Sequence, residues 1–341
     1  MNKTQIVALI LGISVSSTVF AEWEALPDKA PAPANNPTTE AKIQLGRTLF
    51  FDPRLSSTGT VSCNSCHNVM LGGDDNRAVS MGIHGKTGGR SAPTVWNSAF
   101  NASQFWDGRA GSLEEQALGP ITNPIEMGLP DIDAALTRLR AIPGYENMFA
   151  SAFGQKNAIT SENLAKAIAA YERTLITPNS PYDRFVQGDT TAMSEQQLRG
   201  MNTFAEVGCA ACHSGPAFSG PTAAAGGFFM KFPTFAEHDL VTKYDFMSDK
   251  GRFEATKKDG DQHFWKVPTL RNVAMTAPYF HNGKVQTLDE AVRVMGKVQL
   301  NTELKEGQVN DLVAFLTSLS GPFPKQAMPN LPGTAGLSLT K

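Results

Sequence analysis

Several absences limit what this 341-residue chain can be. It carries 30 Lys and Arg against 32 Asp and Glu, with no basic patch or block of like charge, so nucleic acid is not an expected partner. No heptad run predicts a coiled coil. Beyond the first 21 residues, no apolar run approaches the roughly 20 residues that a membrane-spanning helix needs. These absences predict a globular protein, but composition alone does not indicate its reaction.

The first residues have the features of an export signal. Lys3 supplies a short basic region, residues 6–20 are apolar, and residues 19–21 fit a small-residue cleavage site. Because the apolar stretch is short for a membrane span, we expect residues 1–21 to be a signal peptide and the mature protein to be periplasmic. An uncleaved N-terminal anchor is the alternative. The remaining chain, about 320 residues, is long enough for two domains with a core each.

Cysteine is scarce, and its placement is the most informative feature of the chain. All four cysteines fall in two Cys-x-x-Cys-His motifs. This pentapeptide is the attachment signature of c-type haem, in which two thiols form thioethers with the haem and the histidine ligates the iron. Two disulfides or one four-cysteine zinc site are the alternatives, but neither explains a histidine after each second cysteine. The sequence therefore predicts two haem c groups, attached through Cys63, Cys66, Cys209 and Cys212 and ligated by His67 and His213.

Apolar residues at helical spacing predict a mainly α fold with long loops and little strand. One helix is expected over about 39–52, and a clearer one over 161–176 with Ser161 as its cap. A last helix is expected near 307–319, before a Pro-rich tail. Proline and asparagine at 177–181 break the chain and indicate a domain boundary.

An internal repeat with a period of about 175 residues predicts that the fold is duplicated. The paired segments are 92–97 with 267–272, 105–109 with 280–284, and 113–115 with 288–290. Each copy follows its own haem motif, so we expect two cytochrome c-like domains. The copies differ where Trp106 matches His281, and where Glu126 precedes the Met-Gly pair of the first copy but Val294 precedes that of the second. The expected segments are a signal peptide (1–21), an arm (22–38), an N-terminal domain (39–180), a C-terminal domain (181–322) and a tail (323–341).

Five segments, in the same order along the chain, carry a resemblance to a known family. They are 49–56, the first haem motif with Asn68-Val69, 105–109, 123–128 and 277–283. Together they resemble the bacterial diheme cytochrome c peroxidases from about Thr39 to Pro322. The resemblance implies a homodimeric periplasmic enzyme that reduces hydrogen peroxide to two waters. It also implies a small soluble electron donor, a monohaem cytochrome c or a copper protein (cupredoxin), docking near the C-terminal haem.

The resemblance implies unequal roles for the two haem groups. The N-terminal one becomes the low-potential peroxidatic centre, with His67 proximal and His84 as a removable distal ligand. Glycines flank His84 in the loop 81–85, which suits a detachable ligand. Reduction of the other haem is expected to release His84, so that peroxide can bind. An electron-transfer haem, in contrast, has both axial positions filled.

Methionine is the implied sixth ligand of the C-terminal, high-potential haem. Met295 matches this ligand, opposite His213, and a thioether favours reduced iron and so raises the potential. Met275 and Met247 are the competing candidates. A core methionine on the helix from Leu288 to Met295 is the alternative interpretation.

The resemblance also implies catalytic residues beside the open site. Glu126 carries a proton between the two peroxide oxygens, and Gln116 positions peroxide. Trp106 carries electrons between the haem groups, with Trp96 a weaker candidate. His281 contacts a haem propionate. A calcium ion between the domains is held partly by backbone oxygens near Thr276 and Pro278, with Ser91 where some relatives have asparagine.

Three other functions use a similar pair of haem motifs. An enzyme of the related tryptophan-tryptophylquinone-forming type acts on a protein substrate, but it places tyrosine where this chain has Met295. A diheme electron carrier would have both irons permanently six-coordinate and no use for Glu126. A haem-based sensor is expected to carry an output domain, and none is visible.

Overall fold

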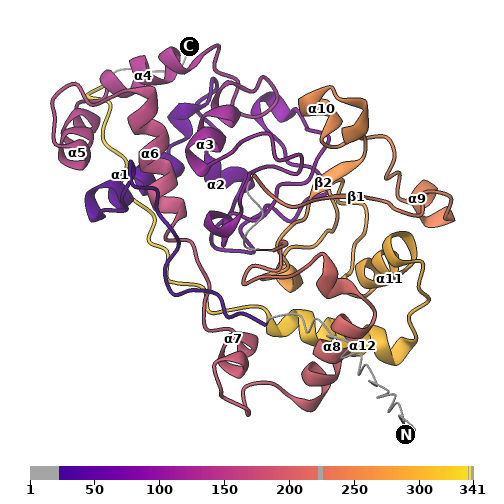
Figure 1. The fold of residues 1–341 in the computed structure, drawn as a ribbon. Coiled ribbons are helices and arrows are strands. Elements are labelled where there is room, and N and C mark those ends of the chain that lie inside the picture. The colour runs from indigo at the N-terminus through magenta and orange to yellow at the C-terminus, as the bar shows by residue number, and fades with distance from the viewer. Residues whose placement is uncertain (1–22, 222–225, 337, 339–341) are drawn as a thin grey trace, which may run out of the picture.

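The computed structural model describes residues 23–221, 226–336 and 338, so the expected signal peptide (1–21) lies outside the described residues. Helices joined by long loops dominate (Figure 1), and the two short strands β1 (Phe229–Lys231) and β2 (Phe264–Lys266) pair antiparallel. This confirms the mainly α prediction. None of the described helices is long and apolar enough to cross a membrane. The helices are α1 (Glu40–Phe50), α2 (Cys63–Cys66), α3 (Leu113–Thr122), α4 (Ile132–Arg140), α5 (Pro143–Phe153), α6 (Ser161–Glu172), α7 (Pro181–Val186), α8 (Glu195–Glu206), α9 (Asp239–Lys243), α10 (Phe253–Thr256), α11 (Leu288–Leu300) and α12 (Glu306–Ser318).

Each half of the molecule is built on one close crossing of two helices. In the N-terminal half α1 crosses α6, and a Cβ added at Gly46 would lie 1.9 Å from the carbonyl oxygen of Ala167. In the C-terminal half α8 crosses α12, and a Cβ at Gly200 would lie 1.9 Å from the carbonyl oxygen of Asp311. Because only glycine permits so close an approach, the same packing device recurs in both halves.

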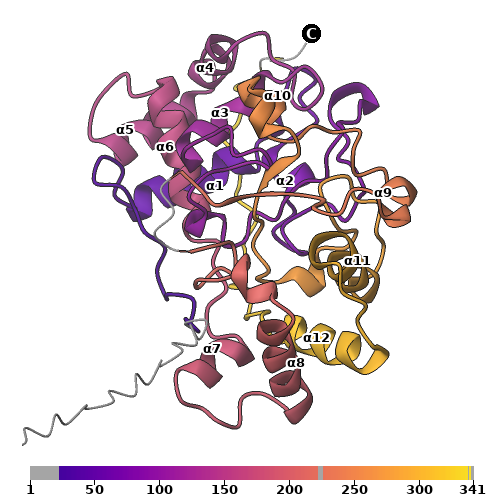
Figure 2. The same cartoon turned by 45° about the vertical axis from the view of Figure 1, so that its right-hand side comes forward.

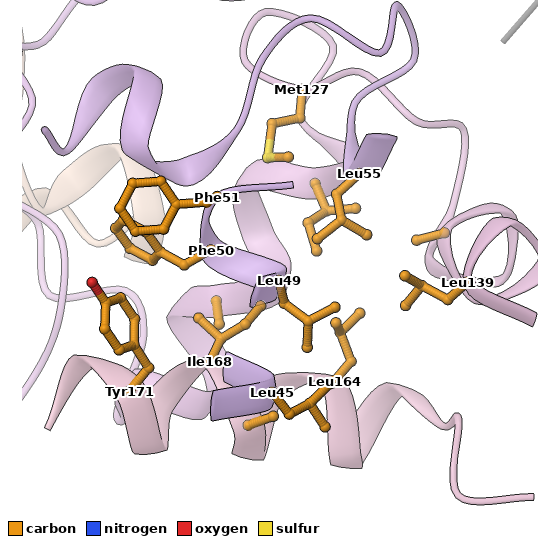
Figure 3. Packing of buried hydrophobic residues seen from close by; sticks show 14 of the residues in the cluster. Leu45, Leu49, Phe50, Phe51, Leu55, Met127, Leu139, Leu164, Ile168 and Tyr171 are labelled. Atoms are coloured by element: carbon orange, nitrogen blue, oxygen red, sulfur yellow. The ribbon is translucent and has the colours of Figure 1, made fainter. Parts of the chain in front are cut away.

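Separate apolar cores surround the two crossings. Figure 3 shows the N-terminal core, in which Leu45 and Leu49 of α1 pack with Leu164 and Ile168 of α6. Met127, also in this core, is 2% exposed and anchors the loop that carries Glu126. The C-terminal core is aromatic and is formed around α8 and α12 by Tyr182, Phe204, Phe218 and Phe315.

The backbone shows the duplication more directly than the sequence does. Asn97 and Asn272 both adopt positive φ angles, 64° and 59°, and each precedes a turn of 3-10 helix. Phe105 and Phe280 share a φ of 68°. Isolated bridges also recur at the same offset, Gln104 with Ala110 and Tyr279 with Val285. The predicted duplication is therefore present as a repeated backbone path.

The two repeats meet at one buried hydrogen-bond cluster around Thr177. The side-chain amides of Asn97 and Asn272 each donate to the Thr177 hydroxyl oxygen, at 2.9 Å in both cases. The Thr177 amide donates in turn to the Asn97 side-chain oxygen at 2.9 Å. All three residues are 0% exposed. The chain break predicted at 177–181 is thus a fixed junction between the halves.

The arm and the tail each reach the opposite half of the molecule. In the arm, the Leu26 amide donates to Asp183 of α7 at 2.9 Å, and the Trp23 ring packs among the aromatic rings of the C-terminal core. In the tail, Phe323 packs against Trp96, with ring centroids 4.8 Å apart. The tail (yellow) runs beside α1 and α6 toward α4 in Figure 1, while the arm (indigo) leads from beside α7 toward α1 in Figure 2. The two terminal segments therefore add contacts that join the halves.

The helix expected over 161–176 is shorter at its C-terminal end and has a different cap. Thr160 rather than Ser161 is the N-cap, because its hydroxyl accepts the Asn163 amide at 3.2 Å. The helix ends at Glu172, and the backbone beyond it turns toward the cluster at Thr177. The helices expected near 39–52 and 307–319 are present as α1 and α12.

We expect Gly46→Ala and Gly200→Ala each to lower the melting temperature, because an added methyl group would push the crossing helices apart. Overpacking of this kind costs about 1–3 kcal/mol. Gly307→Ala in α12 is the matched control, since nothing lies within 4 Å of its added Cβ. Thermal unfolding of the haem-loaded protein, followed by circular dichroism, measures the effect. A melting temperature in the two crossing variants equal to that of the control variant would contradict this packing.

Candidate functional site

Both motif histidines are held in the same orientation by a backbone carbonyl. Nδ1 of His67 lies 3.0 Å from the Pro93 oxygen, and Nδ1 of His213 lies 3.0 Å from the Phe218 oxygen. Because a carbonyl oxygen only accepts, Nδ1 carries the hydrogen in each ring, and the Nε2 lone pair remains for a metal. Burial lowers the pKa of both imidazoles, which favours the neutral, ligating form. The two histidines therefore fit the role of axial iron ligand.

The cysteines fit thioether attachment better than thiolate chemistry. Each motif forms one helical turn, in which the histidine amide donates to the first cysteine's carbonyl at 2.9 Å. Burial raises the pKa of all four thiols, to about 11 for Cys66 and about 12 for Cys209, so the neutral form is favoured. The four cysteines form no disulfide, and no group of three or more His, Cys, Asp or Glu in the described part of the chain could hold a metal. The zinc and disulfide alternatives are therefore wrong, and haem c fits each motif.

A large apolar cavity lies beside the second motif. Cys209, Cys212 and His213 line it from one side, and Met295 of α11 lines it as well. The competing Met275 and Met247 are 48% and 40% exposed and are not among the lining residues. The structure thus brings Met295 and His213 to one cavity. The role of Met295 as an iron ligand stays a prediction. Met230 of β1 also lines this cavity, and no sequence pattern had singled it out.

Glu126 lies beside the first motif. Its carboxylate is near enough to Cys63 and Cys66 to contribute to the raised pKa of both thiols. Burial raises the pKa of Glu126 itself, and the Arg109 guanidinium partly opposes this shift. The Asn123 side-chain amide donates to its Oε1 at 3.0 Å. The structure therefore places a half-buried carboxyl group with a raised pKa beside the first motif.

Two further residues, Gln116 and Arg109, bear on this site. Gln116 is half-buried on α3, the helix whose C-terminal end leads into the loop 123–128. Arg109, which the sequence patterns did not single out as a site residue, stacks on Phe105 with its guanidinium carbon 3.4 Å from the ring centroid. Its positive charge partly opposes the rise that burial causes in the pKa of Glu126.

His84 lies at the exposed tip of a loop that is attached to the Glu126 loop. Its φ angle is 53°, and Met81 and Thr87 bridge the base of the loop. The Ile83 amide donates to the Glu126 carbonyl at 2.9 Å, and the Lys86 ammonium donates to the Pro124 carbonyl at 3.0 Å. A movement of the His84 loop would therefore be transmitted to the loop that carries Glu126.

The segment 91–94 is a wall shared by the two sites. The Pro93 carbonyl orients His67 of the first site, and the whole segment lines the cavity of the second. Trp106 is fixed to this wall, because its indole N–H donates to the Ser91 carbonyl at 2.9 Å. Trp106 also lines the cavity, and its role in electron transfer stays a prediction.

Residues that the sequence did not single out hold Trp106 and His281 in place. The Trp265 ring stacks on His281, with centroids 4.0 Å apart, and the Trp106 ring meets His281 edge-on at 6.4 Å. Arg90 forms ion pairs at 2.6 Å with Asp107 of its own half and with Asp249 of the C-terminal half. Trp96, the weaker candidate for electron transfer, is fully buried in the N-terminal core.

The residues expected near calcium share one wall of the cavity. Ser91, Thr276 and Pro278 all line it. The side-chain amide of Asn76 donates to the carbonyl of Ala277, between the two expected ligands, at 3.0 Å. Asp74 is buried nearby, and its Oδ1 has no hydrogen-bond partner in the described structure. Calcium binding stays a prediction.

Comparison with known proteins bears on these two sites. The family model described as di-haem cytochrome c peroxidase matches residues 40–191. The cytochrome c551 peroxidase of Pseudomonas aeruginosa is 42% identical over 98% of this chain and 97% of that protein. The methylamine utilization protein MauG of Methylorubrum extorquens is 36% identical, covering 90% and 86%. A crystal structure of a MauG-like protein associated with microbial copper homeostasis superposes with a TM-score of 0.76 at 30% identity, covering 87% and 95%.

We expect Met295→Tyr to lower the midpoint potential of the C-terminal haem, because it removes a thioether that favours reduced iron. A shift of at least about 59 mV, a tenfold change in the one-electron equilibrium, is the expected size. Redox titration of the holoprotein measures it, with the exposed Met275→Leu as the matched control. A shift in the control and none in Met295→Tyr would assign the ligand to Met275.

Proposed function

The chain belongs to the diheme cytochrome c peroxidase family, and we propose that, as such a peroxidase, it reduces hydrogen peroxide at the N-terminal site with electrons stored at the C-terminal site. We further propose that it works in the periplasm as a homodimer and binds one calcium ion between its halves. When bound, the two haem groups supply the electrons and the iron site for this reduction. The overall reaction consumes one peroxide, two electrons and two protons and yields two waters.

One observation supports these separate roles: an acidic side chain lies at the first site and none lines the described part of the second. Glu126, a carboxyl group with a raised pKa, lies beside Cys63 and Cys66. No Asp or Glu is among the described residues that line the cavity of the second motif. Peroxide reduction needs proton transfer and electron storage does not, so the first site is suited to the reaction and the second to holding an electron.

Glu126 performs the proton transfer in this proposal. In its ionised form, the carboxylate accepts the proton from one oxygen of the bound peroxide and returns it to the other, which leaves as water. Asn123 holds Oε1 at 3.0 Å, and Met127 fixes the loop in the core, so the acceptor atom is positioned before peroxide arrives. Gln116, on the adjoining helix, orients the peroxide by hydrogen bonding.

His84 controls access to the first site in this proposal. Its exposed loop is joined to the Glu126 loop through Ile83 and Lys86, so release of the histidine and positioning of the acid are coupled. Trp106, fixed to Ser91 and lining the second cavity, conducts electrons between the sites.

A small soluble cytochrome c is the proposed electron donor, with a small copper protein as the alternative. The Pseudomonas aeruginosa relative is named for cytochrome c551, which supports a cytochrome donor. Ala211 is exposed and Cys212 is partly exposed, so the attachment turn at the second site reaches the surface where a donor could approach.

Half-reduced protein should show one haem changing to a high-spin or five-coordinate form as the other is reduced. This follows because reduction at the C-terminal site is proposed to free the first site of His84. Absorption and electron paramagnetic resonance spectra during a reductive titration measure the change, alongside peroxide turnover. If both sites stay six-coordinate and turnover is absent, the protein is an electron carrier instead.

We expect Glu126→Gln to lower peroxide turnover by about two to four orders of magnitude, the usual contribution of general acid–base catalysis. Because burial raises the pKa of Glu126, its ionised form is lost at higher pH than in an exposed glutamate. Parent turnover should therefore fall on acidification before the pH reaches about 4.3, and the variant should lose this dependence. Steady-state kinetics across pH measure both effects.

Glu162→Gln is the matched control, since this glutamate lies in the same half and its side chain is 73% exposed. It should retain parent turnover and the parent pH profile. Equal turnover in the Glu126 and Glu162 variants would show that Glu126 does not move the proton.

A further inference from the structure

Lys266 is a buried cation without an acidic partner. The residue ends β2 and is 8% exposed. Its ammonium nitrogen has one recorded contact, the Val267 carbonyl at 3.4 Å, and no ion pair joins it to any acid in the described part of the chain. Burial lowers the pKa of Lys266 to about 8. A buried charge is costly unless it is paired. An anion that the described residues do not provide would therefore stabilise this lysine.

The surroundings of Lys266 indicate where that anion lies. Lys266 lines the apolar cavity together with Cys209, His213 and Met295, and no other Lys or Arg is among the described lining residues. Its charge is also near enough to contribute to the lowered pKa of His213. The unpaired ammonium therefore belongs to the wall of the C-terminal haem site.

His281, which lines the same cavity, carries a polar atom without a partner. Nε2 of His281 has no hydrogen-bond partner in the described structure, and this side chain is only 3% exposed. The Trp265 ring, next to Lys266 in sequence, stacks on His281 and fixes it. The cavity wall thus carries one cation and one neutral imidazole, which together can hold a carboxylate.

We propose that Lys266 is a positioning residue that binds a carboxylate of the haem attached at Cys209 and Cys212. The ion pair anchors the haem edge and holds its midpoint potential high, because a nearby cation disfavours the more positive ferric state. The Lys266 amide also donates to the Trp106 carbonyl at 2.9 Å, so the same residue is bonded to the backbone of the tryptophan proposed to conduct electrons. The proposal rests on haem attachment at the second motif and does not require peroxide turnover.

Midpoint potentials of the holoprotein test this role. Lys266→Met and Lys266→Gln should each lower the equilibrium constant for reduction of the C-terminal haem at least tenfold. This corresponds to a midpoint potential lower by about 59 mV or more. Lys266→Arg, which keeps the charge, should recover at least half of this shift. Lys258→Met is the matched control, because it removes the same charge from an exposed position outside the cavity wall and should leave the potential unchanged.

Each alternative outcome overturns the proposal. A parent-like potential in both neutral variants, with two haem groups still bound, would leave Lys266 a purely structural role. An equal shift in the Lys258 variant would point to a general charge effect. Titration of the parent with acetate at constant ionic strength identifies the source of the carboxylate. A potential that changes with acetate would show that Lys266 binds an anion from solution rather than the haem.

Discussion

The buried cluster at Thr177 fixes the relation between the two halves, and the proposed electron transfer between the two sites depends on this relation. One hydroxyl oxygen accepts the side-chain amides of both Asn97 and Asn272, so the equivalent points of the two repeats meet on one atom. A hydrogen bond lost at this fully buried place would leave polar groups without water or partner. The cluster therefore fixes the two repeats relative to each other. The arm and the tail add further contacts between the halves.

Within that frame, the sites differ mainly in the charge that the chain places around them. The first carries the carboxyl group of Glu126, whose protonation is favoured by burial and opposed by Arg109. The second has an apolar wall with a single cation, Lys266, and no acid among its described lining residues. An acid that gains and loses a proton serves bond cleavage, whereas a fixed cation serves a stable reduced state. In the proposed function, these few charges give the duplicated fold two different tasks.

Contact between the sites runs through backbone as much as through side chains. The segment 91–94 orients His67 by one carbonyl and holds Trp106 by another, while it lines the cavity of the second site. Arg90, which also pairs with Asp107 of its own half, crosses the same interface through its ion pair with Asp249. A shift at one site is therefore conveyed through a shared wall, which gives the proposed coupling between reduction and His84 release a physical route.

The sequence by itself determined the haem attachment points, the duplication, the helical class and the family, because spacing and order along the chain carry this information. It also named Glu126 and Met295, but only through resemblance, since an isolated glutamate or methionine has no local signature. The N-cap at Thr160, the exposed position of His84 and the burial of Lys266 were decided only by the tertiary structure. The physical reason is that burial and missing partners are properties of segments brought together from far apart. Lys266 is an ordinary basic residue in the sequence, and it becomes an anion-binding candidate only where the fold removes it from water.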